Sequence, residues 1–456
     1  MKILKAFLLC TVLIACKEDV TGSREVIEIK SPDGHDIWFM PIIEDGVSDI
    51  TIMMAWPTDW SYDATRHPAV PYIASEAILS GGTETLKPQE LMEVFNDANA
   101  GGWLTVASDY AYGELGFPRE HTDEIVPIAA TMLANPQLDP AWVARISAGL
   151  KANQEQNQAQ STTRMWMAAR KAIFGDAPEL AYHSLPDTAG ITDVTPEMVR
   201  AWHREILTQD VPVIVVTGAI NATDAGQAVD TLLEQLPAGP ARPIAPSGAN
   251  FAQRTILLHL PDAEKTTIGF LGQMPPTKDG GDLIDLLATQ ILSDANGPLF
   301  EAVRTEMRAT YGLQAGYANF DRATRLMFIT GEIETAKLAQ AHDVILRTYE
   351  EFRSDPALGG LKAVRDNLAD GFAEDVKYVD VAAQMIRELV LDGQDPTLAP
   401  NFDNVLREIT AEDVKDRLLS AFPKAEDLIV IVASPDQNAL PGACVITEVS
   451  QASLCP

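Results

Sequence analysis

The sequence predicts an α+β fold made of two homologous domains, each with a mostly antiparallel or mixed sheet packed against helices. Two observations lead to this prediction. Segments with strand and helix patterns are grouped along the chain rather than strictly alternating, which argues against a purely parallel sheet. A helix-then-strand pattern also occurs twice, 215 residues apart. The length of 456 residues exceeds what one hydrophobic core usually supports, which agrees with two domains.

The internal repeat is clearest where a threonine precedes an amphipathic helix that leads into an apolar strand. Thr195 begins this pattern in the first copy, and Thr410 begins it in the second. A second repeated segment, "AILSGG" in the first copy and "QILSDANG" in the second, is offset by 213 residues. Because helix-then-strand units are common, one repeated segment would be weak evidence, but two at nearly the same offset indicate duplication.

Within each copy, hydrophobic periodicity predicts the individual strands and helices. The strands of the first copy are predicted in "REVIEIK", "DIWFMPII", "DITIMMAW" and "WLTVASDYAYGELGF", and its helices in Thr122–Leu133 and Pro140–Gln154. The strands of the second copy are predicted in "RTILLHL", "TTIGFLGQM", "AGYANF" and "RLMFITGEI", and its helices from Asp282, in Ala336–Phe352 and in Leu361–Leu391.

The domain boundaries follow from the repeat and from a proline-rich segment between the copies, "LPAGPARPIAPSGANFAQ". We expect six parts: a signal peptide (1–15), a tether (16–23), an N-terminal domain (24–235), a linker (236–253), a homologous C-terminal domain (254–437) and a tail (438–456).

The N-terminus is typical of an exported bacterial lipoprotein. Lys2 and Lys5 precede an apolar run, Ala6–Ala15, that is too short to span a bilayer. The run ends in "LIAC", which resembles a lipobox and predicts that Cys16 is acylated and becomes the new N-terminus. An ordinary cleaved signal with an incidental cysteine is the alternative. A lysine rather than an aspartate after the cysteine favours the outer membrane, facing the periplasm.

The charge of the chain is strongly one-sided, with 65 acidic against 34 basic residues and a net charge of −31. Such a polyanion repels nucleic acid and anionic lipid, so neither is an expected partner, and contact with the membrane should run through the lipid anchor alone. Two further cysteines, Cys444 and Cys455, are expected to form a disulfide in an oxidising compartment, with two free thiols as the alternative.

In its duplicated domains, its linker and phrases such as "YHSLPDTAGITDVTPEMV" before "VIVVTG", the chain resembles the insulinase-like (pitrilysin) metallopeptidase family. The likeness is greatest to bacterial members that act as two-domain subunits. Active members of that family carry H-x-x-E-H on a helix, where two histidines hold zinc and the glutamate activates a bound water.

The resemblance implies that the zinc site of this chain is degenerate. Aligning Gly82-Thr83 with the family's Gly-Thr pair places Ile73 and Ala77 at the histidine positions and Glu76 at the glutamate. Isoleucine and alanine cannot ligate zinc, so we expect Glu76 to be a relic. Glu155 is the nearest candidate for a further family ligand, without a confident match, and none of the seven histidines lies in a zinc motif, so each is expected to be a surface or capping residue.

The second copy retains a different family feature. Arg304 and Tyr311 stand at the family's Leu-Phe-x-x-x-Arg to tyrosine spacing, after Leu299 and Phe300. The resemblance implies that this pair supports the substrate backbone and the developing oxyanion in trans. The alternative is a helix-surface arginine beside a strand aromatic, and Pro298 departs from the family pattern.

These features together predict a non-catalytic, Arg/Tyr-bearing subunit of a heterodimeric periplasmic zinc peptidase. The chain itself would bind no cofactor and would cleave no peptide alone; zinc is expected in a homologous partner subunit that carries HxxEH. It would bind and position peptide substrates, by strand addition to a sheet edge. A peptide-binding or scaffolding lipoprotein without a catalytic partner is the alternative, and a stand-alone peptidase with unfamiliar ligands is a third.

Overall fold

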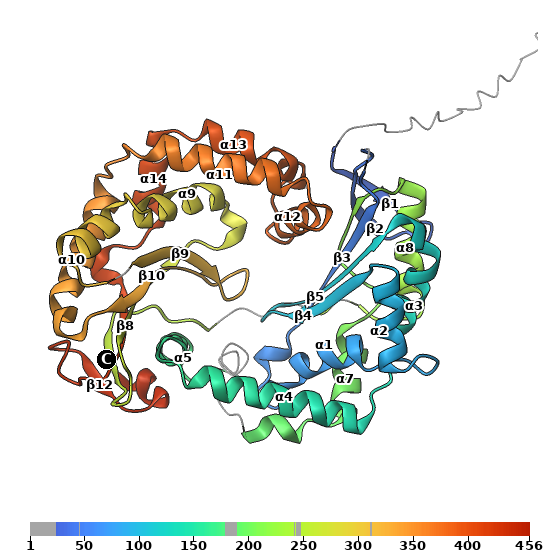
Figure 1. Ribbon diagram of the computed structural model, residues 1–456, viewed down its shortest axis with the longest axis horizontal. Helices are drawn as coiled ribbons and strands as arrows, with labels where there is room; N and C mark the ends of the chain where they lie inside the picture. Colours follow the sequence, from blue (N-terminus) through green and yellow to red (C-terminus); the bar gives the residue numbers. More distant parts are fainter. Residues whose placement is uncertain (1–23, 45, 178–188, 241, 243–247, 311) are drawn as a thin grey trace, which may run out of the picture.

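The computed structural model describes residues 24–44, 46–177, 189–240, 242, 248–310 and 312–456, and all structural statements refer to these. The predicted signal peptide, the lipidation site Cys16, the tether and Tyr311 lie outside the described residues. The predicted α+β class is confirmed, because the chain forms two six-stranded mixed sheets packed against helices (Figure 1).

The first half contains six strands and seven described α-helices. The strands are β1 (Ile27–Lys30), β2 (Asp36–Pro41), β3 (Asp49–Pro57), β4 (Gly101–Val106), β5 (Tyr110–Pro118) and β6 (Val213–Gly218). The helices are α1 (Val70–Ser80), α2 (Pro88–Asp97), α3 (Thr122–Ala134), α4 (Pro140–Gln158), α5 (Ser161–Phe174), α7 (Pro196–Ile206) and α8 (Ala222–Leu233).

The second half has a similar order of elements, except that the strand corresponding to β1 comes last, as β12. Its strands are β7 (Thr255–His259), β8 (Thr266–Met274), β9 (Leu313–Asn319), β10 (Arg325–Ile333), β11 (Ile429–Ser434) and β12 (Cys444–Ile446). Its helices are α9 (Asp282–Ser293), the π-helix η5 (Phe300–Glu306), α10 (Leu338–Ser354), α11 (Leu361–Asp375), α12 (Val379–Leu391), α13 (Phe402–Glu408) and α14 (Ala411–Ala421), with short 3₁₀ turns that include η9 (Val449–Leu454).

Strand order confirms the duplication. The strand orders are β1-β2-β6-β3-β5-β4 in the first sheet and β12-β7-β11-β8-β10-β9 in the second. The strand that follows the repeated helix is β6 in the first half and β11 in the second. Each pairs in parallel with one neighbour (β2 or β7) and antiparallel with the other (β3 or β8). The predicted threonine caps are also present: Thr195 accepts from the N–H of Met198, and Thr410 accepts from that of Asp413.

Two expected elements are each divided in the structure. The run predicted as one strand, "WLTVASDYAYGELGF", forms a hairpin of β4 and β5 with its turn at Ser108 and Asp109. Small polar residues of this kind favour turns by bonding to nearby backbone. The helix expected over Leu361–Leu391 breaks after Asp375 and resumes as α12 at Val379.

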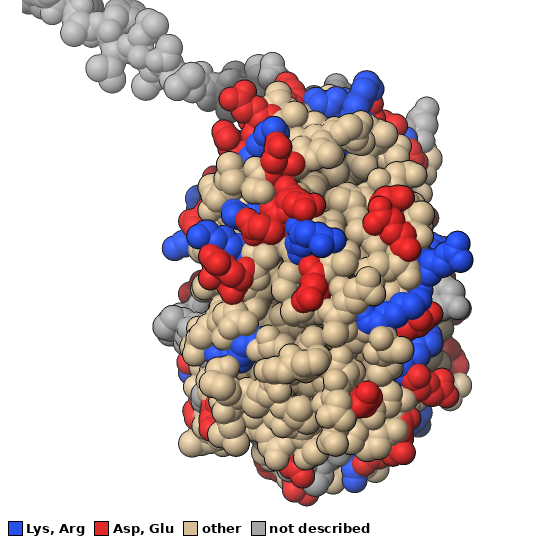
Figure 2. Space-filling model, turned by 90° about the vertical axis from the view of Figure 1, so that its left-hand side faces the viewer, with Lys and Arg blue, Asp and Glu red and all other residues tan. Residues whose placement is uncertain are grey.

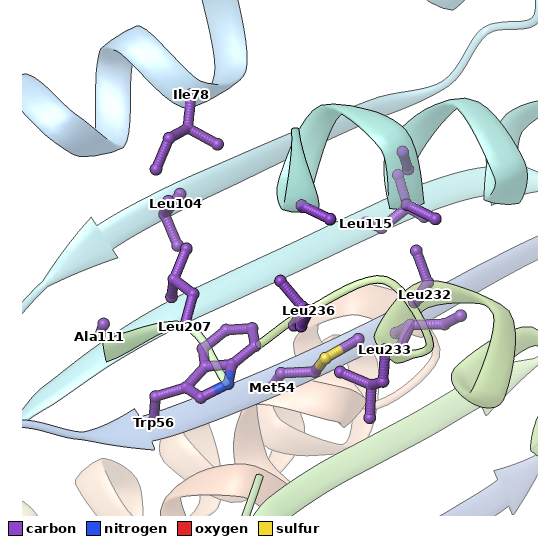
Figure 3. Close-up of a cluster of buried hydrophobic side chains, with 14 of the residues drawn as sticks. Met54, Trp56, Ile78, Leu104, Ala111, Leu115, Leu207, Leu232, Leu233 and Leu236 are labelled. Atoms are coloured by element: carbon purple, nitrogen blue, oxygen red, sulfur yellow. The ribbon is translucent and has the colours of Figure 1, made fainter. Parts of the chain in front are cut away.

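The core of the first half lies between its sheet and helices α1, α3, α7 and α8. Figure 3 shows Ile78 of α1 pointing toward Leu104 of β4, and the Trp56 ring lying near Leu207. The indole N–H of Trp56 is satisfied by the carbonyl of Thr208 at 3.0 Å. This packing fixes α1 beside β4 at the margin of the sheet.

Each half also lends one helix to the other. Helix α5 of the first half packs on the second sheet, with Met165 and Ile173 buried among side chains such as Ile431. Helix α12 of the second half packs on the first sheet, with Ile386 buried near Val215. Because these two helices hold corresponding places in the two copies, the exchange is reciprocal, and each sheet has helices on both faces.

The C-terminal tail belongs to the second sheet. Strand β12 pairs in parallel with β7, and a disulfide joins Cys444 to Cys455, with Cα atoms 5.8 Å apart. Of the helices in the described part of the chain, none is both long enough and apolar enough to cross a membrane.

Candidate functional site

The degenerate zinc positions lie on α1, at one side of the first sheet. Ile73 is fully buried and Ala77 is 1% exposed, and both belong to the apolar core. Most of α1 is buried, as its apolar sequence suggests, but the side chain of Glu76 is exposed. Solvent therefore hydrates this carboxylate, and the helix pays no desolvation penalty for it.

The side chains at the family's ligand positions do not fit a zinc ion. Neither Ile73 nor Ala77 has a donor atom, and Glu155, on α4, is exposed and lies 3.8 Å from Lys151. Within the described ranges no group of three or more metal-ligating side chains is found. His203 is only 5% exposed, but its Nε2 bonds the carbonyl of Leu133 in the last turn of α3 at 2.7 Å, as expected of a capping residue.

Arg304 lies in the second half, on the π-helix η5. Its side chain is exposed, and its guanidinium stacks over the ring of Phe300, 4.6 Å from the ring centroid. π-Helical turns are uncommon and often occur at functional sites. Its expected partner Tyr311 lies outside the described residues, so the pair itself stays a prediction.

The first sheet ends at β4, which pairs with β5 and with no second strand among the described residues. The N–H of Ala107 donates to the carbonyl of Tyr110 at 2.7 Å, so Ala107 and Tyr110 form a hydrogen-bonded pair at the turn of the β4–β5 hairpin. Bonded pairs alternate along an antiparallel ladder, so the backbone polar groups of Val106, Leu104 and Gly102 point to the open side. An extended peptide can pair with exactly such an edge through three residues.

An apolar groove of about 620 Å³ begins where β4 begins. Its walls come from the C-terminal end of α1, from α2, and from the first turns of α4, where Trp142 donates its indole N–H to Ser80 at 3.0 Å. Arg145 lies over the ring of Trp142, 4.8 Å from the centroid. The degenerate zinc helix, the open edge strand and this groove are therefore neighbours.

A polar cluster joins the two halves where the β4–β5 hairpin meets the β9–β10 hairpin. The backbone N–H of Arg322, in the β9–β10 turn, donates to Asp109 of the β4–β5 turn at 2.8 Å. The Arg322 guanidinium pairs with Glu388 of α12 and with Asp392, which follows that helix, each at 2.7 Å. Burial raises the pKa of Asp109 to about 6, against the opposing effect of its contacts with Arg322.

Sequence reasoning did not find the edge strand, the groove or this cluster. The signal that was available is the pair Ser108-Asp109, because recognising it as a turn would have divided the run into a hairpin and left one strand at an edge. The distribution of charged side chains gives no comparable indication of where the site lies. On the face in Figure 2, which shows the second half, basic and acidic side chains are interspersed rather than gathered by sign.

Comparison with known proteins agrees with this geometry. Residues 193–366 match a family model described as the peptidase M16 inactive domain. The search of curated proteins gave no match. Among solved structures, the chain is similar to a peptidase M16 inactive domain from Pseudomonas fluorescens, with 17% identity and a TM-score of 0.78, over 90% of this chain and 98% of that one.

Two longer proteins share the fold over about half of their length. The periplasmic protease PqqL from Escherichia coli is 12% identical with a TM-score of 0.68, over 95% of this chain and 50% of that one. A mutant of the ferredoxin protease FusC, solved in complex with Arabidopsis ferredoxin, is 12% identical with a TM-score of 0.74, over 91% of this chain and 45% of that one.

At such identities the solved structures establish the fold alone. The family model matches residues 193–366, a segment that does not include α1. Over that segment the chain is similar to the peptidase M16 inactive domain, which agrees with the insulinase-like resemblance, and the side chains at the ligand positions of α1 form no zinc motif.

Proposed function

We propose that this chain is the non-catalytic, substrate-binding subunit of a periplasmic zinc peptidase and that it holds extended peptide along the open edge of β4. The observation that carries the proposal is the position of α1. The helix that bears zinc in active relatives has no ligands here, yet it still lies against an edge strand whose backbone is free to pair.

The proposal assigns the chemistry to a partner. A homologous subunit with an intact HxxEH motif would supply zinc and the activated water, and this chain would contribute Arg304 and Tyr311 from its second half. The lipobox at Cys16 would hold the complex at the outer membrane, facing the periplasm. The name of PqqL, a periplasmic protease, and the FusC complex with a protein substrate are consistent with this role.

Peptide binding through the edge strand can be tested with backbone-modified peptides. Strand addition uses the N–H groups of alternate peptide residues, so N-methylation of one alternate set should abolish binding and N-methylation of the other should leave it unchanged. The measurement is fluorescence anisotropy of a labelled extended peptide with the purified chain. Equal effects of both sets would contradict strand addition.

On the protein side, Val106→Pro removes an N–H that points to the open edge, and Val106→Ala is the matched control that keeps it. Proline should weaken peptide binding while the hairpin stays closed, since that N–H does not bond β5.

The partner is tested by purifying the lipoprotein from membranes of its host and identifying what accompanies it by mass spectrometry. Co-purification of an HxxEH-bearing homologue, and loss of turnover by about 10²–10³ in the complex when Arg304→Ala is introduced, are the expected results. A lipidated chain that binds peptide but purifies without a zinc peptidase would instead establish the scaffolding alternative.

A further inference from the structure

We propose that the apolar groove beside β4 binds one large apolar side chain of the bound peptide, and that Arg145 at its rim binds a carboxylate of the same peptide. This inference rests on the proposed peptide-binding function and names the class of peptide that the site prefers.

The groove continues the open edge of β4. Ala100, Gly101 and Gly102, at the start of that strand, form part of its lining. A peptide that pairs with Leu104 and Val106 therefore reaches the groove within a few residues, because strands rise about 3.3 Å per residue. The two exposed glycines carry no side chain that would separate an incoming strand from the groove.

The lining suits an apolar side chain of variable shape. Leu79, Leu91, Phe95 and Met132 contribute apolar surface, and Met92 is 58% exposed at the opening. A single exposed apolar side chain is ordinary, but Met92 adjoins an apolar groove, and methionine adapts to different ligands through its flexible thioether. A smaller apolar cavity of about 50 Å³ lies next to the groove and shares Leu79 and Met132 with it.

The positive charge of Arg145, at the rim of the groove, predicts the second feature of the bound peptide, which is a carboxylate. Arg145 is exposed and is held over the Trp142 ring, and Trp142 is itself fixed by Ser80. No carboxylate in the described part of the chain pairs with this guanidinium, although the protein has 65 acidic residues. An arginine whose position is fixed in this way favours a carboxylate from outside.

The carboxylate can belong to an acidic side chain or to the C-terminus of the peptide, and two arms of the experiment separate these sources. The probe is a fluorescein-labelled peptide with a single leucine beside a single aspartate, in forms with a C-terminal acid or amide. Leucine to alanine should weaken binding by about tenfold or more. If aspartate to asparagine weakens binding, the side chain is the ligand; if amidation does, the terminus is.

Matched variants locate the effect on the protein. Met92→Glu should remove the preference for leucine over alanine, and Arg145→Glu should remove the preference for the carboxylate. Leu419→Glu, on α14 of the second half, is the control, because Leu419 is 54% exposed and lies outside the groove. All three positions are exposed, so none of the changes should unfold the chain, which circular dichroism can verify.

A photocrosslink gives a readout independent of affinity. A peptide with benzoylphenylalanine in place of the leucine should label the segment that contains Met92, and Met92→Ala should shift the label away. Peptide binding with no leucine preference, or labelling confined to other segments, would overturn the groove while leaving strand addition intact. Binding that is absent for every peptide would overturn both.

Discussion

The two halves of the molecule have the same strand order but fill the space beneath their sheets differently. In the second half, Arg325 is fully buried and bonds Asp285 at 2.9 Å, and Arg417 pairs with the same carboxylate at 2.7 Å. In the first half the corresponding positions are apolar: Ala111 pairs with Trp56 on β3 as Arg325 pairs with Met274 on β8, and Trp202 lies where the repeat offset places Arg417, with both side chains buried in the same core.

This difference shows that the fold depends on filled volume more than on a particular chemistry. An ion cluster in the second half and apolar core side chains in the first half occupy equivalent places under equivalent sheets. Buried ions are tolerated only when all their partners are present, whereas an apolar core loses stability gradually as its contacts are removed. The halves should therefore respond differently to equivalent substitutions.

The largest effect is expected from Asp285→Asn, which removes the counter-charge shared by the fully buried Arg325 and the partly buried Arg417, while Arg325 keeps Asp282 at 2.6 Å. We expect the free energy of unfolding to fall by about 3 kcal/mol, the lower end of the range for a broken buried ion pair. Trp202→Phe, at the first-half position that corresponds to Arg417, should cost less, because no charge is left unpaired. Urea denaturation measures both, and similar losses would remove the distinction between the halves.

The same comparison can be sharpened by transplanting the side chains that the first half has at these places, Tyr72, Ala111 and Trp202, which all belong to or pack against one core. Changing Asp285→Tyr, Arg325→Ala and Arg417→Trp together should recover most of the stability that Asp285→Asn loses, as urea denaturation can measure, since replacing a whole buried ion set by packed side chains is often neutral or stabilising.

A pH dependence is expected where the two halves meet. The pKa of Asp109 is about 6, above the ordinary value near 3.8, because the carboxyl is buried. The folded state therefore binds its proton more tightly than the unfolded state, so this group's contribution to stability is fully present below pH 4 and is lost as pH rises through 6. The loss should be about 3 kcal/mol or less.

Comparing the wild type with Asp109→Asn isolates this contribution from that of the other carboxylates. The free energy of unfolding of the wild type minus that of the variant should decrease between pH 4 and 6.5. A difference that is flat over this range, or that increases, would contradict a raised pKa at the contact between the hairpins.

The outer edges of the two sheets also differ, because β12 is tied by a disulfide and β1 is not. The joined cysteines are 11 residues apart, so replacing both Cys444 and Cys455 by serine should lower the unfolding free energy by about 2–3 kcal/mol. Reduction of the wild type should produce the same shift in the urea midpoint, and an unchanged midpoint would show that the tail adds no stability.

The smallest effect is expected on α1. Glu76→Gln should change stability by no more than about 0.5 kcal/mol, because the side chain is exposed. The chain alone should bind no stoichiometric zinc with either residue, as elemental analysis can test. A tightly held zinc ion that disappears with Glu76→Gln would overturn the view of this glutamate as a relic.

Much of the fold followed from local patterns in the sequence. The threonine caps, the two apolar strands that follow them, and the repeat offset are properties of neighbouring residues, and they predicted the duplicated α+β architecture correctly. The degenerate positions Ile73 and Ala77 could also be located, because they depend on spacing within a single helix.

What could not be predicted depends on contacts between distant segments. The groove requires α1, α2 and α4 to meet at the start of β4, and the polar cluster requires Asp109 to meet Arg322, in a turn more than 200 residues away. Exposure of Glu76 depends on which face of α1 is covered, and a short, nearly uniform apolar helix gives little periodic signal for that.

The reciprocal exchange of α5 and α12 has a consequence for the order in which the molecule can be completed. A chain made from its N-terminus presents the first sheet long before residues 379–391, which cover its inner face, have been synthesised. Until then that face exposes apolar side chains such as Met53 and Val215, a state that invites aggregation. The first domain therefore cannot finish folding until residues 379–391 of the second half have been made.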